Sequence, residues 1–125
     1  MLLDSNILIY GADSGELRLD AILDRTDLAI ASVTRIETLG FHRLSETERT
    51  WLGAAIQRML VLPLTESVEE RAIALRQERK MGLADAIIAA TALVHGLTFV
   101  ARNVDDFKHI ARLRLFNPFT EPEGA

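Results

Sequence analysis

Cysteine is absent from the 125-residue sequence, so neither disulfide bonds nor thiolate metal ligands are available to the chain. Long hydrophobic runs are absent as well, because no uninterrupted apolar stretch approaches the roughly 18 residues that a membrane-spanning helix requires. The first predicted strand begins at Met1, which leaves no room for a signal peptide. We therefore expect a cytoplasmic protein without membrane association, whose single domain buries its own hydrophobic core.

Positive charge is also in short supply. The formal net charge is −4, so the field of the whole molecule does not favour nucleic-acid binding. A polyanionic substrate would require a local basic patch or a metal ion to offset this charge. Arg76, Arg79 and Lys80 form one basic helix end, which we interpret as a solvated face in preference to an RNA contact. Aromatic residues are few, and we interpret Trp51 as core or dimer packing and not as a base-stacking platform.

Short apolar segments alternate with amphipathic ones along the chain, without an internal repeat or linker. This alternation predicts a single domain over residues 1–118 and a flexible tail over residues 119–125. Two patterns, Thr34 to Glu37 and Ser45 to Glu48, are typical of capping boxes at helix starts. The predicted strands cover residues 1–4, 28–31, 60–62, 97–101 and 113–116. The predicted helices begin near residues 7, 16, 32–34, 45, 67 and 83. The third of these helices is expected to run to about residue 44 and the last to residue 95.

The predicted fold class is α/β, a three-layer α/β/α sandwich around a mostly parallel sheet of about five strands. In such sheets ligands bind beyond the carboxyl ends of the strands. Asp4 ends the first strand, Glu37 follows the second by about one helical turn, and residues 103–106 follow the fourth. We expect these side chains to meet Asp85 at one edge of the sheet.

Asp85 lies in the first turn of a predicted helix, residues 83–95, that is apolar almost all the way round. Such a helix is expected to be buried on both faces, and an ionised carboxylate is costly to bury unless it is compensated. The helix dipole contributes only about 0.3–1 kcal/mol. A cation near Asp85 is therefore expected.

Clustered carboxylates repel one another, and a divalent cation reverses this effect. Mg²⁺ and Mn²⁺ prefer oxygen ligands and are held by a few carboxylates together with substrate phosphate. One or two such ions can activate water and neutralise a phosphodiester oxygen. The four acids Asp4, Glu37, Asp85 and Asp106 therefore indicate metal-dependent phosphodiester hydrolysis.

Four segments of the chain contain these acids: Met1-Leu-Leu-Asp-Ser-Asn-Ile7, Ala31-Ser-Val-Thr-Arg-Ile-Glu37, Leu83-Ala-Asp-Ala-Ile-Ile-Ala89 and Ala101-Arg-Asn-Val-Asp-Asp-Phe107. In this order they resemble the motifs of PIN-domain ribonucleases, and in particular VapC-type toxins of prokaryotic type II toxin–antitoxin systems. The resemblance implies a PIN-like α/β/α sandwich, Mg²⁺- or Mn²⁺-dependent cleavage of RNA by water, frequent homodimers, and a cognate antitoxin protein that occupies the acidic cleft. It covers nearly the whole chain.

The resemblance also implies roles for individual residues. Asp4, Glu37 and Asp85 match the metal-site acids, Asp106 matches the fourth acid with Asn103 alongside it, and Asn6 and Thr34 match supporting positions.

The chain departs from the family pattern at one position and offers two candidates for another. Ala101 stands where the family often has threonine, so one hydroxyl near the site is missing. The fourth motif offers both Asp105 and Asp106, and the spacing to Phe107 favours Asp106 without deciding between them. Binding of a second metal ion depends on this fourth acid more than binding of the first does.

Other functions compete with this hypothesis. A phosphatase of the haloacid-dehalogenase kind needs a second acid two residues after Asp4, where this chain has Asn6. A phospho-receiver domain needs a lysine after a late strand, and Lys108 lies in a helix-like position instead. The alternative that stays open is a catalytically silent PIN module that acts as an RNA- or protein-binding scaffold.

Overall fold

The computed structural model describes residues 1–14 and 17–120. Strands and helices alternate along this part of the chain, as the sequence predicts. The elements are β1 (Leu2–Leu3), α1 (Ser5–Ser14), α2 (Leu17–Leu23), β2 (Ala29–Ala31), α3 (Ser32–Leu39), α4 (Glu46–Gln57), β3 (Leu60–Leu62), α5 (Glu66–Glu78), α6 (Leu83–His95), β4 (Phe99–Val100), the 3-10 helix η1 (Val104–Phe107) and β5 (Leu115–Phe116).

The five strands form one sheet in the order β3-β2-β1-β4-β5, and every neighbouring pair is parallel. β1 is the central strand and pairs with β2 on one side and β4 on the other. The order reverses beside β1, because β2 and β3 extend the sheet in one direction and β4 and β5 in the other. The carboxyl end of β1 is therefore the position where a ligand site is expected in a parallel sheet of this kind.

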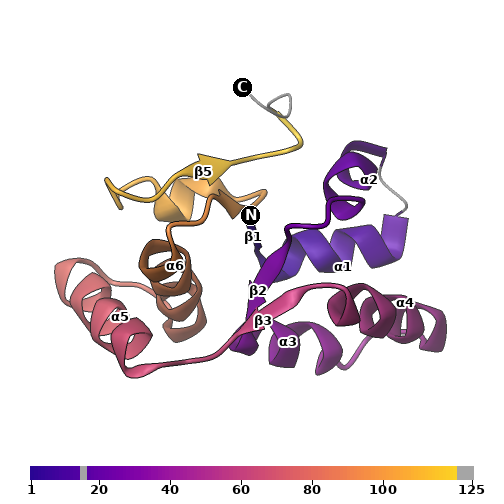
Figure 1. Ribbon diagram of the computed structural model, residues 1–125, viewed down its shortest axis with the longest axis horizontal. Coiled ribbons are helices and arrows are strands. Elements are labelled where there is room, and N and C mark those ends of the chain that lie inside the picture. The colour runs from indigo at the N-terminus through magenta and orange to yellow at the C-terminus, as the bar shows by residue number, and fades with distance from the viewer. Residues whose placement is uncertain (15–16, 121–125) are drawn as a thin grey trace.

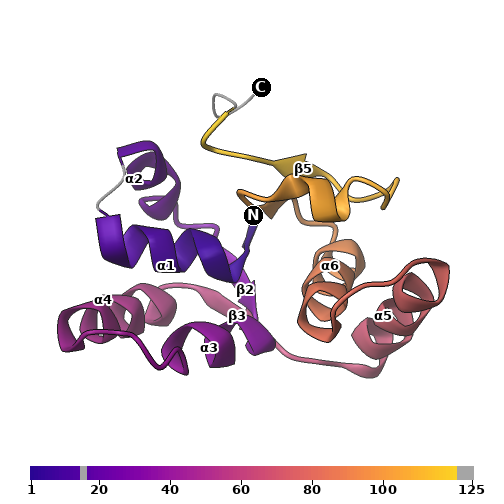
Figure 2. The same cartoon turned by 180° about the vertical axis from the view of Figure 1, so that it is seen from behind.

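Helices cover both faces of the sheet, with α5 and α6 on one side and α1, α2 and α4 on the other (Figures 1 and 2). Successive side chains of a strand point to opposite faces. Leu2 and Phe99 accordingly belong to the cluster under α5 and α6, whereas Leu3 and Val100 belong to the cluster under α1 and α4. The predicted three-layer α/β/α sandwich is confirmed.

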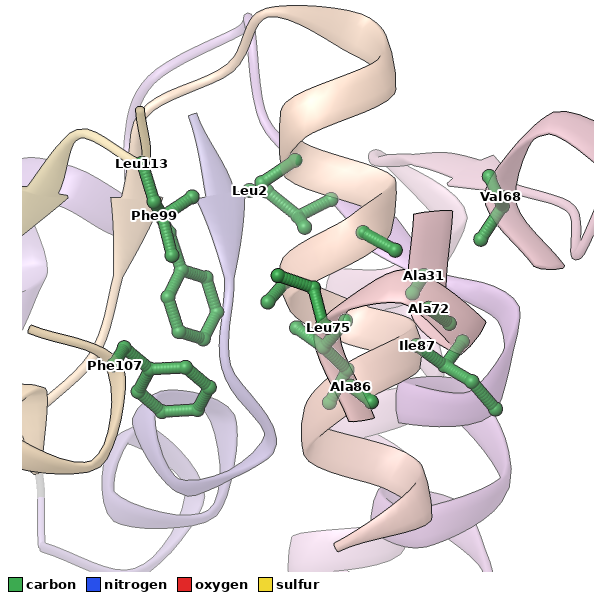
Figure 3. Packing of buried hydrophobic residues seen from close by; sticks show 14 of the residues in the cluster. Leu2, Ala31, Val68, Ala72, Leu75, Ala86, Ile87, Phe99, Phe107 and Leu113 are labelled. Carbon is green, nitrogen blue, oxygen red and sulfur yellow. The ribbon is translucent and has the colours of Figure 1, made fainter. Parts of the chain in front are cut away.

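Helix α6 is the most deeply buried helix of the first layer, and every residue from Ala86 to Ala92 is buried. Its alanines allow close packing against α5, where Ala72 and Leu75 face it, as Figure 3 shows. Gly96 ends the helix in the left-handed conformation, with φ 64° and ψ 34°, which favours glycine. The prediction of a helix buried on both faces and ended by Gly96 is correct.

One of the two predicted capping boxes is wrong. Ser45 and Glu48 form the predicted box at the start of α4. In α3, however, β2 runs directly into a helix that begins at Ser32, so Thr34 lies inside the first turn and caps nothing. The side chain of Glu37 is therefore free to bond elsewhere.

Other helix boundaries also differ from the prediction. Helix α1 begins at Ser5 and not near residue 7. Helix α3 ends at Leu39 and not near Leu44, because Gly40 takes the C-cap and a Cβ there would clash with the Ile36 carbonyl oxygen. Helix α5 begins at Glu66, capped by the Thr65 hydroxyl, which accepts a hydrogen bond from the Val68 N–H.

Trp51 packs in the second core cluster, where it is partly buried. A Cβ on Gly11 would lie 2.9 Å from the Trp51 ring, so the absence of a side chain at Gly11 permits this contact between α1 and α4. This agrees with the core interpretation of Trp51.

Among the described residues, no helix is long and apolar enough to cross a membrane. The tail predicted from residue 119 lies outside the described residues except for Phe119 and Thr120.

Candidate active site

Asp4 occupies the position directly after the central strand β1. Its backbone N–H donates to the Val100 carbonyl at 2.9 Å, which fixes the main chain between β1 and β4. The residue is only 8% exposed. Burial raises the pKa of Asp4 to about 6, a backbone hydrogen bond from Ser5 opposes that rise, and the charges of Asp85 and Glu37 add to it. The sheet thus holds a carboxylate in a place where its charged form is disfavoured.

Glu37 reaches this site from α3, one helical turn beyond the end of β2. The Ser5 hydroxyl donates a hydrogen bond of 2.6 Å to Glu37 Oε1. Ser5 is buried and follows Asp4 directly, so this bond joins the second acidic position to the first. The sequence predicts a helix that begins near residue 7 and does not assign Ser5 to the site. A polar residue directly after a strand-end acid was the signal available.

Asp85 enters from the opposite layer, in the first turn of α6. Gly82 is the N-cap, so no side chain caps the first turn of the helix. Burial raises the pKa of Asp85, and the nearby charges of Asp106 and Glu37 raise it further. Asp85 is half-buried, and Ala86, which follows it, is fully enclosed in the core.

Asp106 and Asn103 follow β4 and belong to one short segment that contains η1. The Asn103 side-chain amide donates to Asp106 Oδ2 at 2.9 Å, which orients that carboxylate. Asp105 is instead paired with Lys108, whose Nζ lies 2.7 Å from Asp105 Oδ1 on an exposed surface. The charge of Asp106 raises the pKa of Asp85, so Asp106 is the acid of this pair that lies near Asp85.

The two remaining predicted positions differ in burial. Thr34 is fully buried, and its hydroxyl has no hydrogen-bond partner among the described residues. It lies three residues before Glu37, on the same face of α3. Asn6 lies on α1 next to Ser5 and is exposed. The charges of Asp85 and Glu37 act on Asp4, and the charge of Asp106 acts on Asp85, so the four acids form one connected cluster. Asp105 is paired with Lys108 instead.

The carboxylates of Asp4, Glu37, Asp85 and Asp106, called the acidic edge below, offer oxygen ligands that suit a hard cation. No three acidic or histidine side chains among the described residues are gathered closely enough to enclose a metal ion by themselves. Mg²⁺ does not need such an enclosure, because it keeps several waters and binds through one or two carboxylates and substrate phosphate. Asp4 and Asp85 have raised pKa values and no cationic partner in the part of the chain that the structure describes, which is the situation that a divalent cation relieves.

The fold and the acidic edge define a class of protein, and comparison with known sequences agrees with it. The family model described as PIN domain matches residues 1–113. The chain belongs to the PIN domain family.

Individual relatives are similar over almost their full length. Ribonuclease VapC10 of Mycobacterium tuberculosis is 33% identical over 130 residues, which cover 98% of this chain and 95% of that protein. A toxin–antitoxin complex from Klebsiella pneumoniae contains a chain that is 32% identical, with a TM-score of 0.78 and coverage of 94% of this chain and 96% of that one. A chain of the DNA-bound VapBC structure from Salmonella typhimurium shares the fold, with a TM-score of 0.83 at 22% identity, covering 94% and 96%.

Proposed function

We propose that this protein is a metal-dependent endoribonuclease and the toxin component of a type II toxin–antitoxin pair. The observation that carries the proposal is the buried Asp4 at the end of the central strand, close enough to Asp85 and Glu37, on two other elements, for their charges to raise its pKa. The similarity to ribonuclease VapC10 and to the toxin–antitoxin complex from Klebsiella pneumoniae supports RNA as the substrate and an antitoxin protein as the partner.

The role that we propose for each acid follows from its burial and its hydrogen bonds. Asp4 and Asp85 would hold Mg²⁺ or Mn²⁺, since both are wholly or partly buried and neither has a cationic partner among the described residues. When bound, the ion would neutralise a phosphodiester oxygen and lower the pKa of a water. Asp106, oriented by Asn103, would complete the acidic site.

Glu37 is suited to a different task. It is exposed, so it can meet solvent and substrate, and the Ser5 hydroxyl holds one of its oxygens at 2.6 Å. The other carboxylate oxygen can accept a hydrogen bond or a proton from the attacking water. We therefore assign Glu37 to orienting and deprotonating this water. Thr34, on the same face of α3, and Asn6 are assigned supporting roles.

The antitoxin partner and a homodimer are part of the same proposal. Several large apolar side chains are exposed in the isolated chain, among them Ile36 at 72% and Leu83 at 62%. Ile36 lies on α3 beside Glu37, and Leu83 lies two residues before Asp85. A partner that covers these side chains would also cover the acidic edge, which fits inhibition by an antitoxin.

The experiment that tests the proposal is cleavage of a mixed pool of single-stranded RNA by purified protein. We expect internal cleavage with Mg²⁺ or Mn²⁺ and none with EDTA. Absence of cleavage with every divalent cation, by folded protein free of any partner, would contradict the enzyme and favour a silent RNA- or protein-binding module. Size-exclusion chromatography with light scattering on the same sample measures whether the chain is a dimer.

A further inference from the structure

Arg102 is a cation placed directly beside the acidic edge. It follows the buried Ala101 at the end of β4 and precedes Asn103. The main chain around it is fixed on both sides, because the Ala101 N–H donates to the Phe116 carbonyl at 3.0 Å and the Asn117 side-chain amide donates to the Arg102 carbonyl at 2.9 Å. The side chain of Arg102 is exposed.

Two aromatic rings hold the guanidinium group of Arg102. Its central carbon lies 4.8 Å from the ring centroid of Tyr10 on α1 and 4.8 Å from that of Phe119. The rings are 5.8 Å apart and inclined at 66°. Phe119 is itself positioned, since its N–H donates to Asn117 Oδ1 at 2.9 Å, and the chain after β5 runs toward the side of the molecule that carries α1 and α2 (Figures 1 and 2).

The contacts of Arg102 with the rings of Tyr10 and Phe119, called the clamp below, order the guanidinium group without neutralising its charge. A guanidinium group that lies against aromatic rings keeps its positive charge, and its N–H groups that point away from the rings stay available for hydrogen bonds. No carboxylate among the described residues is paired with Arg102. Other arginines have bonds of their own: Arg25 pairs with Asp27, and Arg114 donates to the Gly96 carbonyl.

The clamp is also close to the proposed reaction centre. Tyr10 lies five residues after Ser5 on α1, which corresponds to about 7.5 Å along the helix axis. Ser5 is bonded to Glu37 and follows Asp4. On a protein with a net charge of −4 whose active edge is acidic, an ordered cation without a carboxylate partner in the described chain can attract an anionic strand from this distance.

We propose that Arg102, held against the rings of Tyr10 and Phe119, binds a backbone phosphate of the RNA strand next to the phosphate that is cleaved. The inference rests on the proposed function for the identity of the ligand as RNA. A guanidinium group donates two parallel hydrogen bonds to a phosphate, and its pre-ordering by the rings reduces the entropy lost on binding.

The test is binding of a fluorescently labelled single-stranded RNA to protein that carries Asp85→Asn to suppress cleavage, measured by anisotropy over a range of salt concentrations. We expect Arg102→Ala to weaken binding roughly fivefold and to reduce the slope of log K against log salt by about 0.7, the value for one phosphate on a single strand. Arg102→Lys should keep the slope and lose part of the affinity. Phe119→Leu should do the same, because the charge stays but the clamp is loosened.

Arg58→Ala is the matched control. It removes one exposed positive charge at the end of α4, just before β3 begins, and therefore at the opposite edge of the sheet. We expect its affinity to stay within about twofold of the parent, since a distant surface charge is screened by salt. Equal weakening by Arg102→Ala and Arg58→Ala would overturn the inference, because it would reflect net charge alone.

Cleavage assays on protein that retains Asp85 separate this inference from the proposed function. We expect Arg102→Ala to raise KM while kcat stays within about twofold. Metal-dependent cleavage by a folded Arg102→Ala protein with unchanged KM and unchanged salt slope would overturn the inference alone. RNA binding that depends on Arg102, without cleavage by the wild-type chain, would overturn the enzyme and leave only the contact between Arg102 and an RNA phosphate standing. Should Arg102→Ala fail to fold, Arg102→Lys and Phe119→Leu decide, and parental affinity in both would overturn the inference.

Discussion

The Ser5 hydroxyl donates a hydrogen bond of 2.6 Å to Glu37 Oε1, and this bond joins two residues that lie 32 positions apart in the sequence. Ser5 follows the central strand, whereas Glu37 follows its neighbour β2 by one turn of α3. Because Ser5 is buried at the end of that strand, it fixes where the carboxylate of Glu37 lies relative to Asp4. The relationship makes Ser5 a positioning residue for the proposed water-activating group.

Ser5→Ala should therefore lower kcat for RNA cleavage by roughly 10- to 100-fold, the range typical for residues that orient the groups of a metal site. KM should change little, because the substituted group does not touch the substrate. Single-turnover cleavage measures the effect.

Ser45→Ala is the control for Ser5→Ala. It removes the capping-box hydroxyl of α4 and with it a hydrogen bond to the Glu48 N–H. We expect it to lower the free energy of unfolding by about 1 kcal/mol and to leave cleavage unchanged. A loss of kcat in Ser5→Ala no larger than that in Ser45→Ala would show that Ser5 acts only through stability.

Asp4→Asn should abolish cleavage and stabilise the metal-free protein at neutral pH. The pKa of Asp4 is raised from its ordinary value of 3.8 to about 6 in the folded chain. The folded state therefore binds the proton more tightly, and the free energy of unfolding falls as pH rises from about 4 to about 6. The loss amounts to roughly 3 kcal/mol at 1.36 kcal/mol per pKa unit.

Denaturant unfolding in EDTA at several pH values from about 4 to about 8 measures this dependence. In Asp4→Asn the fall between about pH 4 and about pH 6 should be much smaller, so the variant should exceed the wild type in stability at neutral pH. Asp20→Asn, on the exposed side of α2, serves as the control and should follow the wild-type curve. Equal pH dependence in Asp4→Asn and the wild type would show that another group causes it.

The two neighbouring acids of the fourth motif should behave differently. Asp106→Asn should lower cleavage, because Asp106 is oriented by Asn103 and lies near Asp85. Asp105→Asn should leave cleavage within about twofold, because Asp105 is engaged by Lys108 on the surface and surface ion pairs contribute little. Metal-dependent cleavage rates of the two variants, measured side by side, decide the assignment. A larger loss in Asp105→Asn would reverse it.

Much of the architecture could be predicted because hydrophobic pattern determines it. Strands such as Leu60–Leu62 stand out as short apolar runs, and α6 stands out because few helices are apolar on every side. The positions of Asp4 and Asp85 follow from the rule that sites lie at the carboxyl ends of parallel strands.

The remaining features depend on contacts between distant segments, which local pattern does not specify. Thr34 and Glu37 have the spacing of a capping box, yet α3 begins before them, at Ser32. The carboxylate of Glu37 instead accepts a hydrogen bond from the Ser5 hydroxyl. Arg102 could not be singled out from the sequence because its two aromatic partners, Tyr10 and Phe119, lie near opposite ends of the chain. The choice of Asp106 over Asp105 likewise needed the polar contacts of both.

The central claim, a cation held by buried carboxylates for RNA cleavage, is tested most directly by Asp85→Asn. We expect the variant to fold and to lose more than about 100-fold of Mg²⁺- or Mn²⁺-dependent cleavage. We also expect Mg²⁺ to raise the Tm of the wild type by binding to the folded state, and we expect this increase to disappear in the variant. Undiminished cleavage by Asp85→Asn, together with an unchanged Mg²⁺-induced increase in Tm, would contradict the account.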